Sequence, residues 1–526
     1  MRKTLLYISV LALVSCTKNF NAINTNPDES NAQNFDPNYL FTSAEMGYGN
    51  VTEYQLYELG PMVQVLASTL NYYGGGDKYD QFLYSYNSRF FTGSGTGASD
   101  GMLGAAQLVE AKSLAMQKDS GYYSNLIHMS DILFVMIMQR ITDVYGDIPY
   151  SQVGMAKYGI QFPVYDQQQD IYKNMLGRLD TAINELDPTK PLATGDLVYA
   201  GNIAQWKKLG YSLMLRVAMR LTKVDPGTAQ TYAEKAAANT FTGVADNAIV
   251  SLDRGCNTYN ELALDLYEVR WSNTFINYLS HNNDPRLSVL AELPDTGLLN
   301  NNAVPPVPGL VDTLPIGMPN GYDLGGAEDI STAPGYPGPT GTGANVSPLG
   351  NYARPVASVF CAKVNVPVQI ITYAQTELLL AEAKARGWNV GSTSAAAHFA
   401  NGVTAAMQGL AQLSTTLTVP ADSITSYVNA HPLDVGSLQN SLAMINNEYW
   451  VACLWDFPES WSNYRRSGYP ALVPVNYPGN ITNGTIPRRL TYPITENSLN
   501  HVNYQQALQR LGGTDLVTLR VWWDTK

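Results

Sequence analysis

Helical spacing of apolar residues runs through most of this chain and constrains its fold more than any other feature. Trp206, Leu209, Leu213, Val217 and Leu221 recur every three or four positions, as they do on one face of a helix. No run of alternating apolar and polar residues is long enough to supply a central sheet. The sequence therefore predicts a mainly α protein, with helices over about 37–70, 101–117, 124–143, 168–186, 202–222, 228–239, 373–387, 394–409 and 437–455.

Some of these helices are expected to form hairpins. The run from Glu377 to Ala383, a turn at Gly387, and a second helix carrying Ala396 and Phe399 follow the small-residue pattern of a tetratricopeptide hairpin. Trp206-x-x-Leu209-Gly210 is a second fragment of that pattern, but Thr222 stands where a small alanine is expected. We interpret these fragments as divergent repeats, with chance spacing in ordinary packed helices as the alternative.

Two long irregular segments interrupt the helices, at 71–100 and about 291–352. The first is rich in glycine and aromatic residues, and 19 of residues 301–350 are Pro or Gly. Helical patterns resume on both sides of each segment. We therefore interpret both as ordered loops, which are the parts of a fold that most often carry binding sites.

The N-terminal sequence is typical of a lipoprotein signal peptide. Basic Arg2 and Lys3 precede an apolar run over 4–14, which is shorter than the roughly 20 residues of a transmembrane helix. Leu13-Val14-Ser15-Cys16 then matches a lipobox, so we expect Cys16 to be lipidated. Loss of Arg2 and Lys3 would change the net charge from −12 to −14. Such a surface repels phosphate, which argues against a nucleic-acid partner.

Cysteine and histidine give little sign of a metal site. Cys256, Cys361 and Cys453 lie far apart, and their spacing leaves the disulfide state open. No Cys-x-x-Cys occurs, and none of the five histidines forms His-x-x-x-His, so zinc is not expected. Calcium remains an alternative in a glycine-rich loop with three acidic residues: Asp323, Glu328 and Asp329.

Two features favour an enzyme as the alternative class. Ser99 lies in a Gly-x-Ser-x-Gly sequence, but a loop stands where a nucleophile elbow needs a strand, and an N-cap role for Ser99 or Asp100 explains the sequence more plainly. An acidic cluster beside tryptophans would suit a glycosidase: Glu448, Asp456 and Glu459. The alternative hypothesis is therefore a secreted, lipid-anchored hydrolase.

Motifs along nearly the whole chain resemble the SusD/RagB family of nutrient-binding outer-membrane lipoproteins, and most closely its SusD-like branch. They are Ile23-Asn24-Thr25-Asn26-Pro27, Tyr145-Gly146-Asp147-Ile148-Pro149-Tyr150, Asn283-Asp284-Pro285-Arg286-Leu287, Tyr373-Ala374, Trp461-Ser462-Asn463-Tyr464-Arg465-Arg466-Ser467-Gly468-Tyr469-Pro470, Ile486-Pro487-Arg488-Arg489-Leu490, Tyr492-Pro493, and the terminal run Gly512-Gly513-Thr514-Asp515 to Arg520-Val521-Trp522-Trp523-Asp524.

The resemblance implies a scaffold of tetratricopeptide-like hairpins, with loops and short strands making the ligand face. It implies a non-catalytic protein that captures oligosaccharide or peptide nutrients for a SusC-like, TonB-dependent transporter. It also implies a place in the outer membrane, facing the cell exterior. Thr17-Lys18-Asn19 departs from the acidic run that often follows the lipidated cysteine in such proteins. The expected organisation is a signal peptide over 1–15, a lipidated tether over 16–36 and one domain over 37–526, with helical repeats at about 37–240 and 373–460 around a ligand region at about 241–372.

Four arginines in the C-terminal motifs are interpreted as structural: Arg465, Arg466, Arg488 and Arg489. Fork-shaped guanidinium groups commonly lock a fold by bonding carbonyls and carboxylates. The expected carboxylate partners are Asp456, Glu459 and Glu496.

Aromatic and amide side chains in or beside the irregular segments are the candidate ligand-binding residues. Sugar rings stack their apolar faces on aromatic rings, while amides bond hydroxyl groups, and peptides use similar surfaces. Trp271 is the foremost candidate because Arg270 and Asn273 flank it. The full set is Trp271, Asn273, Tyr72, Tyr73, Tyr79, Tyr322 and Tyr336.

Overall fold

The computed structural model describes residues 34–49, 55–70, 75–80, 91–92, 101–251, 268–292, 315–360 and 366–526. The main compact unit runs from Asn38 to Lys526. Its longer helices are α3 (Asn38–Gly49), α6 (Gly101–Asp119), α7 (Ser124–Tyr145), α8 (Gln168–Glu185), α9 (Ile203–Arg220), α10 (Pro226–Ala237), α12 (Asn273–His281), α15 (Tyr373–Ala385), α16 (Ala395–Leu413), α17 (Ala421–Ala430), α18 (Leu438–Ala452), α19 (Phe457–Ser467) and α21 (His501–Arg510). The mainly α prediction is confirmed.

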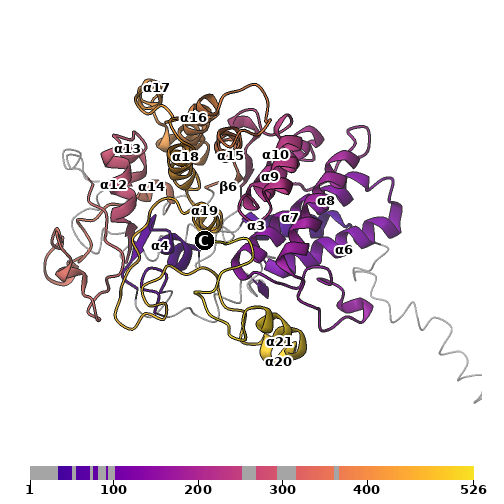
Figure 1. Cartoon of the computed structure of the whole chain (residues 1–526), viewed down its shortest axis with the longest axis horizontal. Helices are drawn as coiled ribbons and strands as arrows, with labels where there is room; N and C mark the ends of the chain where they lie inside the picture. The colour runs from indigo at the N-terminus through magenta and orange to yellow at the C-terminus, as the bar shows by residue number, and fades with distance from the viewer. Residues whose placement is uncertain are drawn as a thin grey trace, which may run out of the picture. The chain divides into compact units, whose positions relative to one another are not determined.

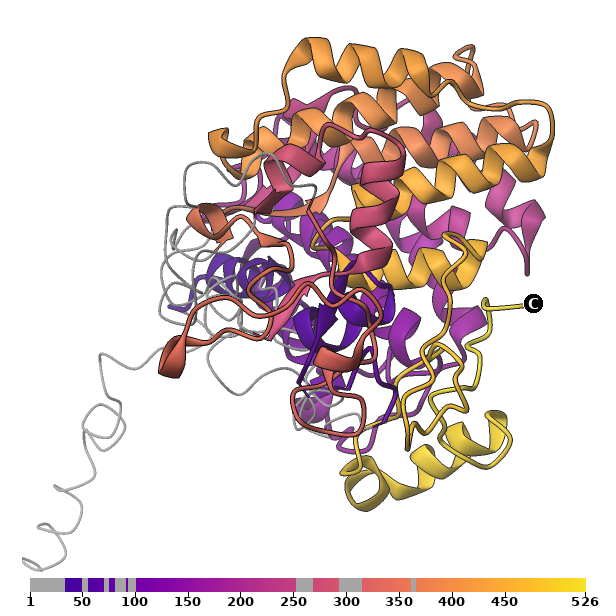
Figure 2. The same cartoon turned by 90° about the vertical axis from the view of Figure 1, so that its left-hand side faces the viewer.

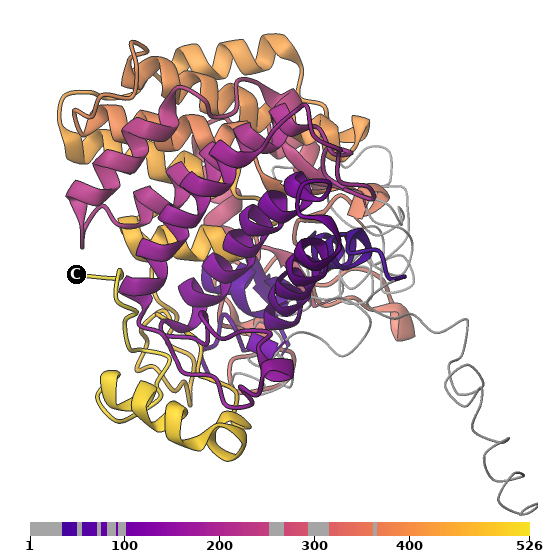
Figure 3. The ribbon, with the colours of Figure 1, turned by 90° about the vertical axis from the view of Figure 1, so that its right-hand side faces the viewer.

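Consecutive helices pack side by side as hairpins. Helices α6 to α10 pack each on the next or next but one, and α15 packs on both α16 and α18. Figure 3 shows the α6–α10 group beside the orange C-terminal helices. Glycine permits the closest contacts: a Cβ on Gly210 would lie 2.5 Å from Ile183, and one on Gly402 would lie 2.7 Å from Leu378. Close helix contact therefore explains the glycine of the predicted Trp206-x-x-Leu209-Gly210 pattern.

Polar caps set where several of these helices begin. Thr372 and Gln375 form a reciprocal capping box at the start of α15. The Asn202 side chain accepts two backbone N–H groups at the start of α9. The α15–α16 turn passes through Gly387 at φ +84°, a left-handed conformation that glycine adopts without steric cost.

The helix predicted over 37–70 is wrong over 63–70, and residues 50–54 lie outside the described part of the chain. A π-helical turn at Gln55–Leu59 leads into α4 (Gly60–Met62) and then strand β1 (Leu66–Ser68). Pro61 lacks a backbone N–H, and Gln64 has φ +54°, so a continuous α-helix cannot pass through this segment. The sequence pattern also gave no separate prediction for α12, α17, α19 or α21.

Pairs of short strands connect distant segments in the loop-rich part of the molecule. Strand β1 pairs antiparallel with β3 (Val269–Trp271), β2 (Ala248–Val250) with β6 (Val368–Ile371), and β4 (Ala291–Glu292) with β5 (Arg354–Pro355). Helix α13 (Leu287–Leu290) and α14 (Ala357–Phe360) lie between these strands in sequence. Figure 2 shows the loops of 315–355 on the side of the molecule that carries α4 and β1.

A second, smaller hydrophobic core lies under these loops. Its buried residues are Ala67, Met318, Ile330, Ala333, Leu349 and Tyr352, with Tyr322, Leu324 and Tyr336 packed against them. Within the described part of the chain, no helix combines the length and apolarity that a membrane span needs.

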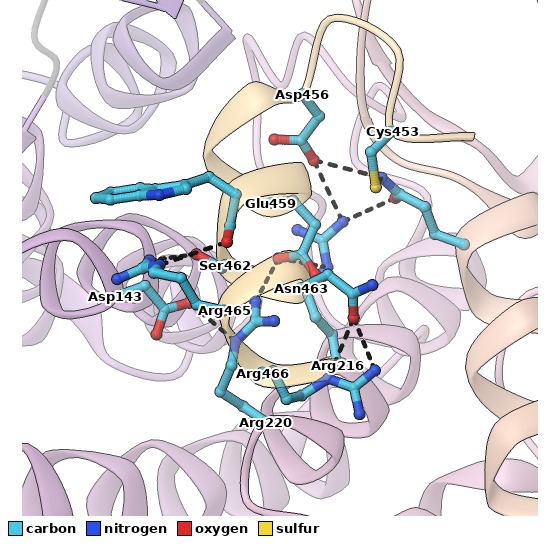
Figure 4. A network of polar contacts seen from close by, with 12 residues as sticks. Asp143, Arg216, Arg220, Cys453, Asp456, Glu459, Ser462, Asn463, Arg465 and Arg466 are labelled. Atoms are coloured by element: carbon cyan, nitrogen blue, oxygen red, sulfur yellow. Dashed lines mark hydrogen bonds and ion pairs between the residues drawn. The ribbon is translucent and has the colours of Figure 1, made fainter. Parts of the chain in front are cut away.

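Helix α19 lies at the centre of the helical frame (Figure 1) and is ion-paired to several of its neighbours. Glu459 accepts from Arg220 of α9 at 2.5 Å, and Arg220 also donates to Asp143 of α7 at 3.2 Å. Arg466 donates to both carboxylate oxygens of Glu382 on α15, at 2.6 and 2.7 Å. All five side chains are buried, and Figure 4 shows the part of this network around α19.

We predict that Glu382→Gln destabilises the protein at neutral pH and less in acid. Burial alone would raise the pKa of Glu382, but Arg466 and Arg386 outweigh it and hold the pKa at about 2, against an ordinary 4.5. The ionised form therefore contributes roughly 3 kcal/mol above pH 4.5, and this contribution is lost as the pH falls from 4.5 towards 2.

Urea unfolding at pH 7 and pH 3 measures this effect, with the exposed Glu185→Gln as the control variant. An equal loss of stability at both pH values would contradict the assignment.

Candidate functional site

An open cleft of about 370 Å³ lies on the loop-rich side of the molecule. Its lining comes from four stretches of chain far apart in sequence: Gln64, Asn273 with Thr274, 319–322 with Glu328, and 473–476. Amide side chains, two prolines, two valines and the Tyr322 ring make up most of this lining. Such a mixture of apolar faces and convergent amides is typical of a small-ligand site.

Gln64 ties three of the four stretches together. Its amide nitrogen donates to the Val473 carbonyl oxygen at 2.6 Å, and its amide oxygen accepts from the Thr274 hydroxyl at 2.8 Å. Its left-handed backbone conformation, with φ +54°, is rare for a residue that has a side chain. Strain of this kind persists only where the surroundings fix it, which is common at binding sites.

Asn320 fixes the floor of the cleft to strand β1. Its side-chain nitrogen donates to the Leu66 carbonyl at 2.8 Å, and its oxygen accepts from the Ser272 hydroxyl at 2.6 Å. Behind it lies a fully buried ion pair, with 3.1 Å between Lys78 Nζ and Asp77 Oδ1. Asp77 also accepts the Ser68 backbone N–H, and Lys78 donates to the Ser68 carbonyl. The floor is therefore held by a satisfied polar network.

Asp323 joins the 320s loop to the 470s loop. Its carboxylate accepts from the Tyr477 hydroxyl at 2.7 Å and from the backbone N–H groups of Gly326 and Glu328. Burial raises the pKa of Asp323, but these hydrogen bonds outweigh it and the pKa lies below its ordinary value. Asp323 therefore stays ionised at neutral pH and acts as a brace between the two walls.

The geometry lends no support to calcium in this loop. The carboxylate of Asp323 already accepts the hydrogen bonds given above, and that of Asp329 accepts hydrogen bonds from Ser331 and Gly325. Among the residues that the structure describes, no three His, Cys, Asp or Glu side chains are grouped as a metal site requires.

The structure brings two of the predicted ligand residues into the cleft and leaves the others out. Asn273 and Tyr322 line it, exposed and half-buried respectively. Tyr336 lies in the second core and donates its hydroxyl to the Pro348 carbonyl at 2.6 Å. Tyr72, Tyr73 and Cys16 lie outside the described residues.

Trp271 and Tyr79 are corrected from binding residues to core residues, since both are 0% exposed. Trp271 packs against Phe275 and Trp455, and its indole nitrogen donates to the Leu290 carbonyl at 3.0 Å. The indole ring is fully buried among these neighbours, so neither of its faces is available to a ligand. Tyr79 lies under the 470s loop, where its carbonyl accepts the Ile481 backbone N–H at 2.7 Å.

Trp271→Ala is therefore expected to destabilise the fold by about 3–5 kcal/mol, as removal of a buried tryptophan side chain usually does. Denaturant unfolding measures the change. A stable variant that only loses ligand affinity would return Trp271 to the binding site.

The cleft residues that sequence reasoning missed are Gln64, Thr274, Asn320 and 473–476. Gln64 lay inside a helix prediction, and no periodic pattern marks the others. One signal was available: the run Val473-Pro474-Val475-Asn476 is uncharged, and Val473 is 77% exposed. A stretch that combines apolar side chains with an amide matches the lining that small-ligand sites usually have.

The acidic cluster behind the hydrolase alternative is part of the core. Glu448 accepts from Arg286 and from the hydroxyls of Tyr278 and Tyr427. Asp456 lies 3.6 Å from Arg216, and Glu459 pairs with Arg220. In the described structure Asp456 and Glu459 line a cavity of about 10 Å³, which is too small for a sugar, and all three carboxylates are held by structural partners. Ser99 lies outside the described residues.

The structural interpretation of the C-terminal arginines is confirmed, although their partners differ from those expected. Arg466 pairs with Glu382, Arg488 with Asp524, and Arg489 with Asp515, while Arg465 donates to the Arg488 carbonyl at 2.7 Å. Of the carboxylates named from sequence, Glu496 accepts from the Tyr165 hydroxyl instead.

A family model for SusD-like proteins, described as starch-binding and associating with the outer membrane, matches residues 29–493. The chain belongs to the SusD-like family. No curated protein matches it in sequence.

Solved structures of similar proteins agree in fold over nearly their full length. A chitin-binding protein is 30% identical with a TM-score of 0.77, over 93% of this chain and 100% of its own. A Bacteroidetes SusD-like protein is 25% identical with a TM-score of 0.78, over 94% and 100%. A chitin-binding SusD homologue from Flavobacterium johnsoniae, 22% identical with a TM-score of 0.70 over 93% and 99%, shows the fold alone.

Proposed function

We propose that this chain captures oligosaccharides in the cleft described above and passes them to a SusC-like, TonB-dependent transporter. The observation that carries the proposal is the full-length similarity to a chitin-binding protein at 30% identity. The cleft supports it, because amides and a half-buried tyrosine suit a ring with an apolar face and polar edges. Chito-oligosaccharides are therefore the first ligands to test, and peptides the second.

The protein is proposed to act without catalysis. The carboxylates that a glycosidase would need are ion-paired in the core, whereas the part of the cleft lining that the structure describes holds a single carboxylate, that of Glu328. Two facing carboxyl groups are required for the usual glycosidase mechanisms.

We predict that Tyr322→Ala weakens binding of a chitin tetramer about five- to ten-fold, since a stacked ring contributes roughly 1 kcal/mol beyond its buried area. Isothermal titration of the purified protein measures the Kd. Tyr336→Ala is the matched control, because that ring also packs on the second core but lies outside the cleft. Equal affinities for the wild type and Tyr322→Ala would move the site elsewhere. If the protein binds peptides but no glycan, its ligand is a peptide and not an oligosaccharide.

Membrane attachment is proposed to depend on the lipid at Cys16, with the protein facing the cell exterior. A net charge of −12 gives no electrostatic attraction to anionic lipid, so Cys16→Ala should release the protein into the soluble fraction. Fractionation after a high-salt wash, in cells that lack the transporter, tests this. A variant still bound to membranes would contradict it.

A further inference from the structure

Among the described residues that line the cleft, one carries a negative charge and none a positive one. Within that described lining, Glu328 is the only ionisable acid or base apart from the tyrosine. It is half-buried, and within the described structure its carboxylate takes part in no hydrogen bond or ion pair. Nothing in the described walls neutralises this charge.

The other charged groups around the cleft leave its electrostatic potential negative. Asp323 and Asp329 flank Glu328 and accept hydrogen bonds only from neutral donors in the described structure. The nearest cation of the floor, Lys78, is 0% exposed and already paired with Asp77. The opposite wall, 470–487, contains no charged residue. A concave surface lined by one sign of charge attracts the opposite sign.

We infer that Glu328 is a specificity-determining residue that favours amine-bearing oligosaccharides, such as deacetylated chitin, over N-acetylated chains and disfavours acidic ones. The inference rests on the proposed oligosaccharide capture and names which sugars the same cleft selects. A protonated sugar amine meets the free carboxylate as an ion pair. An uronic acid instead meets a like charge that nothing in the described cleft offsets.

Because the Glu328 side chain is only partly buried, we expect its effect on the affinity for charged sugars to be small. Ion pairs that water reaches are weak, so a change of roughly three-fold in affinity is expected from one such contact at low salt. Screening should remove most of it at about 1 M salt, where the Debye length is about 3 Å.

The experiment is a titration of three tetramers into three proteins. The ligands are the tetramers of N-acetylglucosamine, glucosamine and galacturonic acid, at a pH where the glucosamine amine is protonated. The proteins are the wild type, Glu328→Gln and the control Glu185→Gln, which removes an exposed carboxylate at the end of α8. Thermal melting first verifies that all three are folded.

The measured quantity is the ratio of Kd for the N-acetylated tetramer to Kd for the glucosamine tetramer. Comparing this ratio between proteins cancels the contacts of the acetyl group itself. We expect Glu328→Gln to lower the ratio about three-fold, to strengthen galacturonate binding by a similar factor, and Glu185→Gln to change neither. High salt should bring the wild-type ratio to that of Glu328→Gln.

An unchanged ratio in Glu328→Gln, with binding intact, overturns the role of Glu328 and leaves oligosaccharide capture standing. An equal fall of the Kd ratio in Glu185→Gln also overturns the role of Glu328, because the change would then come from the overall charge of the protein. Absence of binding for all three tetramers to every protein overturns the proposed function and this inference together.

Discussion

The buried ion pairs of α19 hold the helical frame together, and the remaining structure is arranged around them. Glu459 and Arg466 lie on one helix and pair with Arg220 of α9 and Glu382 of α15, so α19 is ion-paired to helices far apart in sequence. A buried pair of this kind is costly to break, because removal of one partner leaves the other charge without compensation. The network therefore fixes how the two groups of hairpins meet.

A continuous series of contacts links that frame to the cleft. The Trp450 indole of α18 donates to the Val63 carbonyl at 2.9 Å, directly before Gln64. Gln64 then bonds both Thr274 and Val473, on opposite sides of the cleft. Walls made of irregular loops are thus placed by rigid helices, which limits the conformational entropy lost when a ligand binds. The loops contribute most of the side chains that line the cleft, and the helices hold those loops in place.

The sequence predicted the frame better than the site, for physical reasons. Helices such as α7 and α9 can be predicted from the spacing of their apolar residues and from the residues at their ends, which are local properties of the chain. Asn273 and Tyr322 were found because they stand in or beside loops rich in turn residues. Trp271 was misassigned because its burial depends on contacts such as that with Trp455, a residue far away in sequence, which no local pattern reveals. Gln64 was missed for the same reason, since its role arises from three segments that meet only in the folded chain.

The proposed capture site lies between the 319–322 and 473–476 loops, on a helical frame that is expected to stay unchanged when ligand binds. Hydrogen–deuterium exchange with and without a chitin tetramer tests this proposal, since it reports protection along the whole chain. We expect slower exchange in both loops and around Gln64, with α15 and α16 unaltered. Protection confined to the helices α6 to α8, with none in either loop, would contradict it.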